Sequence, residues 1–175
     1  RRHKYFDPNC VIGPLAADGG NYNEVCRSGQ EVYLKQGAEY IHTDETTSAF
    51  IAYAHQQVFE TFEADTLDQF ATIVRESLTA HNLVRLWNFS STLVQNLIGD
   101  GRRYHTTSAD VTAGFENGSQ HFAGGRNASY QRFSRVYAFN SVGQSAFKIQ
   151  EADAALRNTH RGNRIENCFV FGAGV

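Results

Sequence analysis

Three residues close together in the sequence have the side-chain types of an acid–base site. Asp100, Arg102 and His105 offer a carboxylate, a guanidinium and an imidazole within one short segment, and Asp110 follows shortly after. Such groups can donate and remove protons during a bond-cleavage reaction. The alternative is a local role, because Asp in a turn commonly hydrogen-bonds nearby backbone amides. Asp100, Arg102 and His105 are therefore candidate catalytic residues.

The histidines do not form a metal-binding motif. His42, His55, His121 and His160 are scattered, without the spacing of a ligand pair. Gly124-Gly125 is interpreted as a loop, because no phosphate-binding glycine pattern follows a strand and opens a helix here. The motifs therefore predict neither a metal site nor a cofactor.

Three N-x-S sequons begin at Asn88, Asn117 and Asn127. All three fall in loops between predicted strands, where a glycan would face solvent. Their glycosylation is an expectation that depends on a eukaryotic secretory source.

Residues 1–30 lack the periodicity of a helix or a strand and carry two cysteines, Cys10 and Cys26, around a Gly-rich segment. A disulfide between them would close a loop of about 15 residues and contribute roughly 3 kcal/mol. Two buried free thiols are the alternative. We expect this segment to form an N-terminal arm or cap.

Three octets resemble one another position by position, and they organise the rest of the chain. They are residues 94–101, 133–140 and 165–172. Each opens with an apolar residue: Val94, Phe133 and Ile165. Each closes with a type that tolerates positive φ and so favours a turn: Gly101, Asn140 and Gly172.

The spacing inside the octets predicts two strands joined by a sharp bend. The fourth and sixth residues alternate as in a strand, whereas the step of three before them requires a bend. Asn96 and Asn167 occupy this bend, and Asn accepts left-handed geometry better than most residues. Cys168 takes the inward position of Leu97 and Val136, which predicts a core residue rather than a reactive thiol.

A short triplet precedes each octet, and its three side chains are predicted to point inward, outward and inward. The triplets are Val84-Arg85-Leu86, Val111-Thr112-Ala113 and Phe147-Lys148-Ile149. Triplets and octets alternate along the chain, and the connecting loops differ in length. Insertions confined to one class of loop are typical of repeat proteins, so the sequence predicts three turns of one winding.

This pattern resembles the right-handed parallel β-helix superfamily, the pectate-lyase-like and phage-tailspike-like group. Residues 163–172 look like its rung pattern, and residues 30–40 are similar to the first strand of many members. The resemblance covers residues 31–175 and implies an all-β solenoid. It implies no particular chemistry, since one fold hosts many functions.

In that superfamily, active sites lie on the outer face of one sheet, in a groove for a polysaccharide. The corresponding outward residues are Arg85, Trp87, Lys148 and Gln150, with Thr112 between. The indole can pack on a sugar ring while the cations pair with carboxylates, which implies an acidic polysaccharide. Solvated strand exteriors, with Trp87 under a loop, are the alternative. Ca²⁺ is an expected cofactor only for a lyase.

Residues 64–80 are ambiguous between helix and strand. Leu67, Phe70 and Val74 share a helical face, and residues 66–69 have the form of a capping box. Residues 70–74 also suit a strand, which their neighbours favour. With a helix, the order of this segment, residues 83–89, Arg103-Tyr104 and Phe115 resembles the order of motifs in the chorismatase family, α/β enzymes that cleave chorismate. That family carries Gly-Arg where this chain has Asp110-Val111.

The composition limits the class of protein. A chain of 175 residues with 41% apolar and 19% charged residues suits one core, and 15 Gly with 13 Phe and 8 Tyr suit a turn-rich β protein. The net charge of −2 gives no signature of nucleic-acid binding. There is no apolar run long enough for a membrane span. The absence of Met suggests a processed or partial chain.

The sequence stops three residues after the third octet, without a polar cap. We expect another subunit or further chain to cover the exposed strand edge. Together these patterns predict a secreted, extracellular module with a structural or adhesive role in an oligomer or larger assembly. The alternatives are a polysaccharide lyase or glycoside hydrolase acting on an acidic polysaccharide, and a noncatalytic glycan-binding module.

Overall fold

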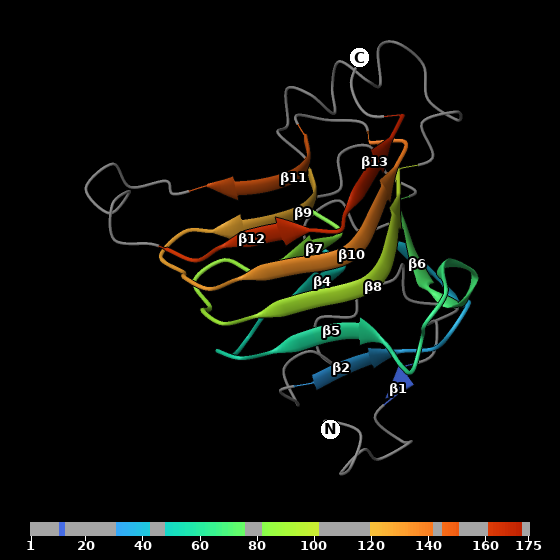
Figure 1. Ribbon diagram of the computed structural model, residues 1–175, viewed down its shortest axis with the longest axis horizontal. Helices are drawn as coiled ribbons and strands as arrows, with labels where there is room; N and C mark the ends of the chain where they lie inside the picture. The colour runs from blue at the N-terminus through green and yellow to red at the C-terminus, as the bar shows by residue number, and fades with distance from the viewer. Residues whose placement is uncertain are drawn as a thin grey trace.

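The computed structural model shows a nearly all-β protein built from parallel strands (Figure 1). It describes residues 11–12, 31–42, 48–75, 82–101, 120–141, 145–150 and 161–172. Among these residues the one helix is a short 3-10 helix, η3 (Leu67–Gln69). No helix in the described ranges has the length and apolar character needed to cross a membrane.

The strands form two sheets, and every strand pair that the structure describes is parallel. The larger sheet has the order β1 (Val11–Ile12), β2 (Glu31–Leu34), β5 (Val58–Thr61), β8 (Leu93–Asp100), β10 (Arg132–Phe139) and β12 (Arg164–Glu166). β3 (Glu39–His42), β6 (Ala71–Arg75) and β13 (Phe169–Phe171) extend it, because β3 pairs with β6, β6 with β8, and β13 with β10. The smaller sheet has the order β11 (Ser145–Gln150), β9 (Gln120–Gly125), β7 (Val84–Arg85) and β4 (Phe50–Ile51).

The chain visits the two sheets alternately, so strands distant in sequence lie side by side (Figure 1). One visit to the smaller sheet followed by one to the larger is termed a pass; β7 with β8 is one pass, and β9 with β10 is the next. An earlier pass, β4 with β5 and β6, was not anticipated from the octets. Each pass pairs in parallel with the one before it.

The three octets lie directly over one another, as predicted. Phe133 pairs with Val94 on one side and with Ile165 on the other. The row continues into the earlier strands, where Phe59 pairs with Val94 and Val32 with Phe59. Val32, Phe59, Val94 and Phe133 are at most 2% exposed. Each such apolar side chain contributes on the order of 2 kcal/mol through burial, so this row forms the core.

Left-handed residues form the bend in the octets. Asn96 and Asn167 have φ values of 55° and 52°, as their type predicts, and Arg135 occupies the same position with φ 52°. At the end of the octets, Asn140 and Gly172 have positive φ values, but Gly101 does not. Gly101 is required for another reason, because a Cβ there would lie 2.1 Å from the Asn140 carbonyl oxygen.

Buried polar side chains hold the corner where the chain enters the larger sheet, a feature that the sequence analysis missed. Gln57, Thr92 and Gln131 are at most 1% exposed. The Gln57 side-chain oxygen accepts a hydrogen bond from the Tyr53 amide at 2.8 Å, and that of Gln131 accepts one from the Gly125 amide at 2.6 Å. These side chains therefore satisfy backbone groups at the corner.

The middle strand of the smaller sheet lies later in the chain than predicted. Phe122 of β9 pairs with Val84 and with Phe147, whereas the triplet 111–113 lies outside the described residues. Gly124 and Gly125 are part of this strand and not a loop. A Cβ on Gly124 would lie 2.5 Å from the Gln131 side-chain oxygen, so glycine is present here for close packing.

Residues 71–75 form strand β6, and the predicted preference for a strand is confirmed there. The helix on which the chorismatase-like interpretation depends is not formed in this segment. The capping signal belongs to η3, where the Gln69 side-chain oxygen accepts hydrogen bonds from the amides of Asp65 and Thr66 at 2.8 and 3.1 Å. The capping box was therefore recognised correctly, but it opens one short turn.

The inward-pointing side chains are buried at the first strands of the larger sheet and exposed at its last strands. Val32 is 2% exposed, whereas Ile165 and Val170 are 46% and 42% exposed. Cys168 is half-buried and packs against the core, as its inward position predicted, and burial raises the pKa of its thiol. β1 lies within the predicted N-terminal arm and extends the larger sheet by pairing with β2.

Candidate functional site

The predicted catalytic residues are described only in part. Asp100 ends β8 on the outer face, since its neighbour Gly99 points inward and pairs with the buried Ala138. The Asn140 side-chain amide donates a hydrogen bond to the Asp100 carboxylate at 2.9 Å. Arg102 and His105 lie outside the described residues, so the three-residue cluster stays a prediction.

Two of the three predicted glycosylation sites lie at one edge of the molecule. Asn88 and Asn127 are exposed and left-handed, with φ values of 68° and 62°. Their passes are adjacent, because the Asn88 amide donates a hydrogen bond to the Arg126 carbonyl at 2.9 Å. Asn117 and the predicted disulfide partners Cys10 and Cys26 lie outside the described residues.

The predicted polysaccharide-binding residues come together on the outer face of the smaller sheet. Arg85 and Lys148 share one row, because both pair with Ala123 of the strand between them. Gln150 pairs with Gly125 at the same end of the sheet as the half-buried Trp87. Thr112, expected between them, lies outside the described residues.

Arg126 joins this surface and was not predicted. Its guanidinium carbon lies 3.5 Å from the centre of the Trp87 ring, and that of Arg85 lies 4.9 Å away. Arg85, Trp87, Arg126 and Lys148 are termed the cationic face. Arg126 directly follows Gly125, so the interpretation of Gly124-Gly125 as a loop concealed its position on the sheet.

The electrostatics of the cationic face favour an anionic ligand. Burial lowers the pKa of Arg85, Tyr53 raises it, and the neighbouring Arg126 lowers it further. Two guanidinium groups therefore lie close enough to repel each other, and the indole ring stabilises both. Trp87 thus orders the two cations. Because Arg126 covers one surface of the indole ring, a sugar cannot stack on that surface as predicted.

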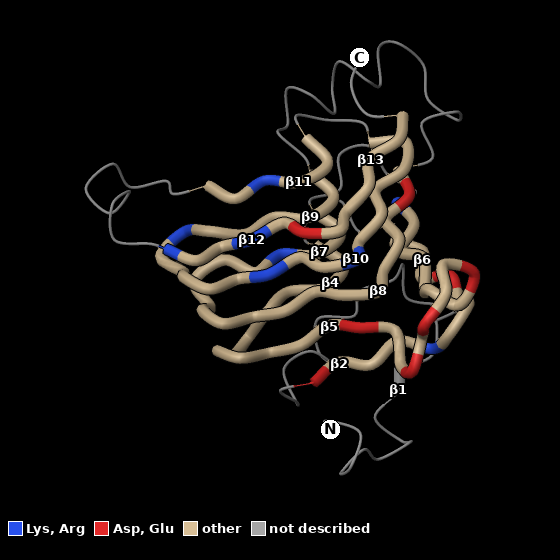
Figure 2. The backbone as a smooth tube through the Cα atoms, viewed as in Figure 1, with Lys and Arg blue, Asp and Glu red and all other residues tan. Residues whose placement is uncertain are grey.

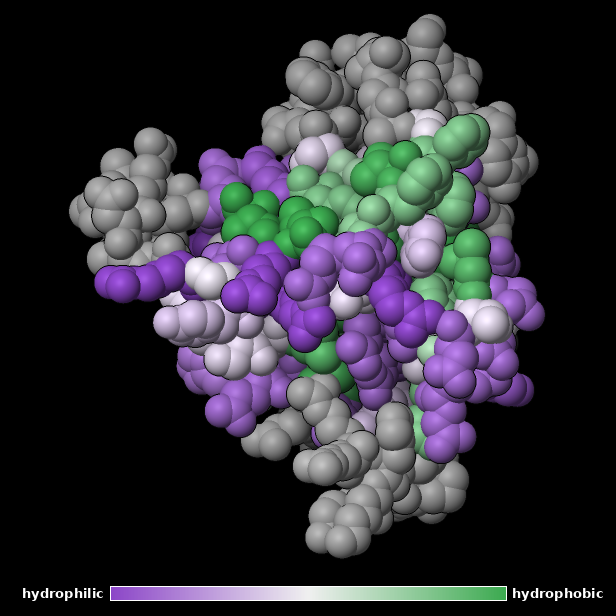
Figure 3. All heavy atoms as spheres, viewed as in Figure 1, coloured by the Kyte–Doolittle hydropathy of each residue, from purple (hydrophilic) through white to green (hydrophobic). Residues whose placement is uncertain are grey.

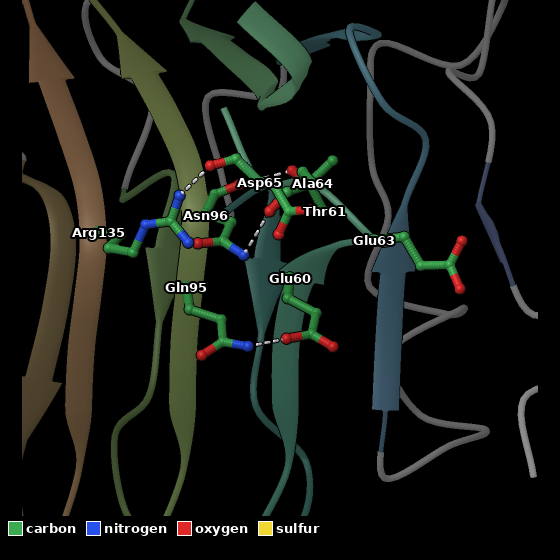
Figure 4. A pocket seen from close by; sticks show the side chains of 8 residues that line it. All are labelled: Glu60, Thr61, Glu63, Ala64, Asp65, Gln95, Asn96 and Arg135. Atoms are coloured by element: carbon green, nitrogen blue, oxygen red, sulfur yellow. Dashed lines mark hydrogen bonds between the residues drawn. The ribbon is translucent and has the colours of Figure 1, made fainter. Parts of the chain in front are cut away.

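A second surface contains a pocket of about 110 Å³ on the outer face of the larger sheet (Figure 4). Three strands and one loop line it: Glu60 and Thr61 of β5, Gln95 and Asn96 of β8, Arg135 of β10, and Glu63, Ala64 and Asp65 before η3. The Gln95 side-chain amide donates a hydrogen bond to the Glu60 carboxylate, and the Arg135 guanidinium donates one to the Asp65 carbonyl. Figure 4 shows Glu63 pointing away from these groups.

Arg135 reaches this pocket from a strained backbone position. The neighbouring passes place Asn96 and Asn167 at the same bend, and Asn tolerates left-handed geometry, whereas Arg has no such local compensation. Its guanidinium carbon lies 5.2 Å from the centre of the Phe70 ring. The strain is consistent with a requirement for the side chain rather than for the bend.

An aromatic strip continues from Phe70 along the outer face of β10 and β13, and Figure 3 shows apolar side chains gathered there. The aromatic strip comprises Phe70, Tyr137, Phe139, Phe169 and Phe171. Tyr137 lies between the rings of Phe70 and Phe169, with centroids at 5.9 and 6.3 Å. Phe169 and Phe171 are 49% and 62% exposed.

The strip had a signal in the sequence. Its strand residues are the fifth and seventh residues of the second and third octets, which alternate with the inward positions used to predict the core. In contrast, the pocket joins residues from three passes, and no local pattern marks it.

The described ranges contain no group of three or more His, Cys, Asp or Glu residues that could hold a metal ion. Comparisons of the chain with protein-family models, with curated proteins and with solved structures found no match.

Proposed function

We propose that this chain is a right-handed parallel β-helix module with an adhesive role, which holds an acidic polysaccharide against its cationic face. Support for the architecture comes from the parallel pairing of successive passes and from the continuous inward row from Val32 to Ile165. Parallel strands joined by crossover connections are right-handed almost without exception. The secreted location belongs to the same proposal.

The position of both Arg85 and Arg126 over Trp87 carries the functional part of the proposal. Lys148 adds a third cation on the row of Arg85, two strand spacings or roughly 10 Å away. A single exposed ion pair is worth at most about 1 kcal/mol. A polymer with a carboxylate on each sugar can contact several cations at once, and the linked contacts raise its overall affinity.

Retention of the protein on immobilised polygalacturonate, with immobilised dextran as the uncharged reference, tests this proposal. We expect retention on polygalacturonate alone, and we expect it to fall as salt rises because salt screens exposed charges. Arg126→Ala and Lys148→Ala should each elute earlier, and the triple variant with Arg85→Ala should not be retained. Lys35→Ala is the matched control, since Lys35 is an exposed cation directly after β2 of the larger sheet, outside the cationic face.

Equal retention of the triple variant and the wild type would rule out this face. Release of reducing or unsaturated sugar ends from polygalacturonate during the same experiment would replace the adhesive role with an enzymatic one. Asn88 and Asn127 directly follow Trp87 and Arg126 in sequence, so a glycan on either would border the face. Material from a glycosylating host should then bind more weakly than material from a bacterial host.

A further inference from the structure

The pocket and the aromatic strip lie next to each other, joined by Phe70, which is itself buried at 3% exposure beneath Arg135. Arg135 lines the pocket and packs on Phe70, Phe70 contacts Tyr137, and Tyr137 contacts Phe169. The strip then crosses to Phe139 and Phe171. A ligand could therefore occupy the polar pocket and the exposed rings together.

The rings of the strip face outward because of the alternation along β10. Val136 and Ala138 are fully buried, and Tyr137 and Phe139 lie between and after them. In register, Phe169 stands beside Tyr137 and Phe171 beside Phe139, so the rings occupy neighbouring strands about 4.8 Å apart. This places a double row of ring surfaces along the direction in which the passes stack.

The charge of this surface is opposite to that of the cationic face. Two carboxylates face the pocket, those of Glu60 and Asp65, against the single guanidinium of Arg135, while the Glu63 carboxylate points away (Figure 4). Figure 2 shows acidic residues gathered around β5 and the segment that leads to β6, and a basic residue on β11 of the smaller sheet. Polyanions should therefore be repelled from the pocket, while hydroxyl groups find acceptors there.

The floor of the pocket is ordered before any ligand arrives. Glu60 is 3% exposed and is held by the Gln95 side chain on the neighbouring strand. Asn96 is held by a hydrogen bond from its amide to the Ala64 carbonyl at 3.1 Å. Because these polar groups are fixed, a ligand that binds them loses little affinity to their ordering.

We propose that this surface binds a neutral saccharide chain, with its sugar rings stacked on the aromatic strip and its terminal or branching hydroxyls in the pocket. Sugars have apolar faces and hydroxyl edges, which match exposed rings beside carboxylate and amide groups. An apolar protein partner would match the rings but would offer no hydrogen-bond donor to the Asp65 carboxylate at the pocket. The site is separate from the cationic face and takes the opposite class of glycan.

Affinity electrophoresis of the full chain in gels that contain galactomannan, xyloglucan or mixed-linkage β-glucan tests the assignment. We expect at least one of these neutral polymers to retard the protein. Phe169→Ala and Phe171→Ala should each weaken the retardation by roughly threefold to tenfold, as expected for the loss of one stacked ring. Glu60→Gln should weaken it too, because the amide replaces an acceptor with a donor.

Tyr130→Ala is the matched control, since Tyr130 is an aromatic residue with 60% exposure that lies outside the strip. Arg126→Ala distinguishes the two sites. This variant should bind polygalacturonate more weakly, and neutral polymers should retard it as much as they retard the wild type. Circular dichroism at matched concentration confirms that each variant is folded.

Three results would overturn the assignment. The first is no retardation by any neutral polymer, and the second is equal retardation of the wild type and of folded Phe169→Ala and Phe171→Ala. The third is concentration-dependent self-association that Phe171→Ala removes, which would show that the strip is a protein interface. Each result leaves the proposal for the cationic face open to its own experiment.

Discussion

The guanidinium carbon of Arg126 lies 3.5 Å from the centre of the Trp87 ring, although the two residues are on different passes of the chain. The backbone reinforces this contact, since the amide of Asn88 donates to the Arg126 carbonyl. Cation–π contacts of this kind contribute about 0.5–1 kcal/mol where solvent reaches them. Trp87 is also the single Trp of the chain, so the tryptophan fluorescence reports on the surroundings of this ring, which include both guanidinium groups.

Replacing Trp87 should separate the effect of the ring from that of its size. Trp87→Phe keeps an aromatic face, whereas Trp87→Leu removes it, so we expect the Leu variant to bind polygalacturonate more weakly than the Phe variant. Retention volumes on the polygalacturonate column measure the difference. Equal retention of the two variants would show that the ring does not order the cations.

The same indole gives a direct assay in the wild-type protein. Addition of polygalacturonate should change the emission of Trp87, because carboxylates bound to the two guanidinium groups change the electrostatic field at the indole ring. Galactomannan should leave the emission unchanged, since its proposed site lies on the aromatic strip. A change with both polymers, or with neither, would contradict the separation of the two surfaces.

The parts of the fold that repeat in the sequence could be predicted from it. The likeness of the three octets predicts that Val94, Phe133 and Ile165 lie side by side, and the three residues pair in this way. The alignment succeeds because a residue that points inward on every pass meets the same apolar environment each time. Asn96 and Asn167 were placed correctly for a similar reason, because a repeated bend selects a residue type that tolerates it.

The parts that depend on contacts between passes could not be predicted. β9 was missed because two adjacent glycines suggest a loop. Gly124 and Gly125 are instead present because the Gln131 side chain and the Gln150 backbone approach them closely, and no local pattern in the sequence shows these contacts. The pocket was missed because the register of three strands, and no local pattern, brings Glu60 beside Gln95. Candidate sites on repeat proteins are therefore visible from sequence only where they follow the repeat.

A buried histidine should make the fold sensitive to acid. Burial, together with the nearby charge of Arg75, lowers the pKa of His121 from 6.5 to about 3. The unfolded chain therefore binds a proton that the folded chain excludes, so stability falls as the pH drops from 6.5 towards 3. At about pH 4.5 the loss amounts to roughly 3 kcal/mol.

Urea denaturation at about pH 7 and about pH 4.5 measures this effect. His121→Gln keeps a donor for the Phe139 carbonyl, which the His121 ring contacts at 3.1 Å, but it cannot titrate. We expect a smaller difference in unfolding free energy between the two pH values than in the wild type. An unchanged difference would assign the acid sensitivity to other groups. His55→Gln is the control, because His55 is exposed.

Arg135 should show a conflict between stability and binding. Its φ of 52° is strained for Arg but not for Asn, so Arg135→Asn is expected to stabilise the protein by up to about 1 kcal/mol. The same substitution removes the cation that packs on Phe70 and lines the pocket, so retardation by neutral polymers should weaken. Thermal unfolding and affinity electrophoresis measure the two effects, and a stabilised variant with full binding would exclude Arg135 from the site.

Gln131 should be the most sensitive of the corner residues. Its side chain accepts a hydrogen bond from the Gly125 amide and donates to the carbonyls of Leu86 and Phe89, which joins both sheets at one corner. Gln131→Leu preserves the approximate size but leaves these buried groups unpaired, at a cost of roughly 2–4 kcal/mol. Thr92→Val is the milder control, because Thr92 makes one weaker bond to the Phe89 carbonyl at 3.3 Å.

Since Gln131 holds the end of β9 that carries Arg126, binding to polygalacturonate should weaken in Gln131→Leu even where the variant remains folded. Chemical denaturation and column retention together test this, and a variant that loses stability but keeps full binding would show that the corner does not position the cationic face.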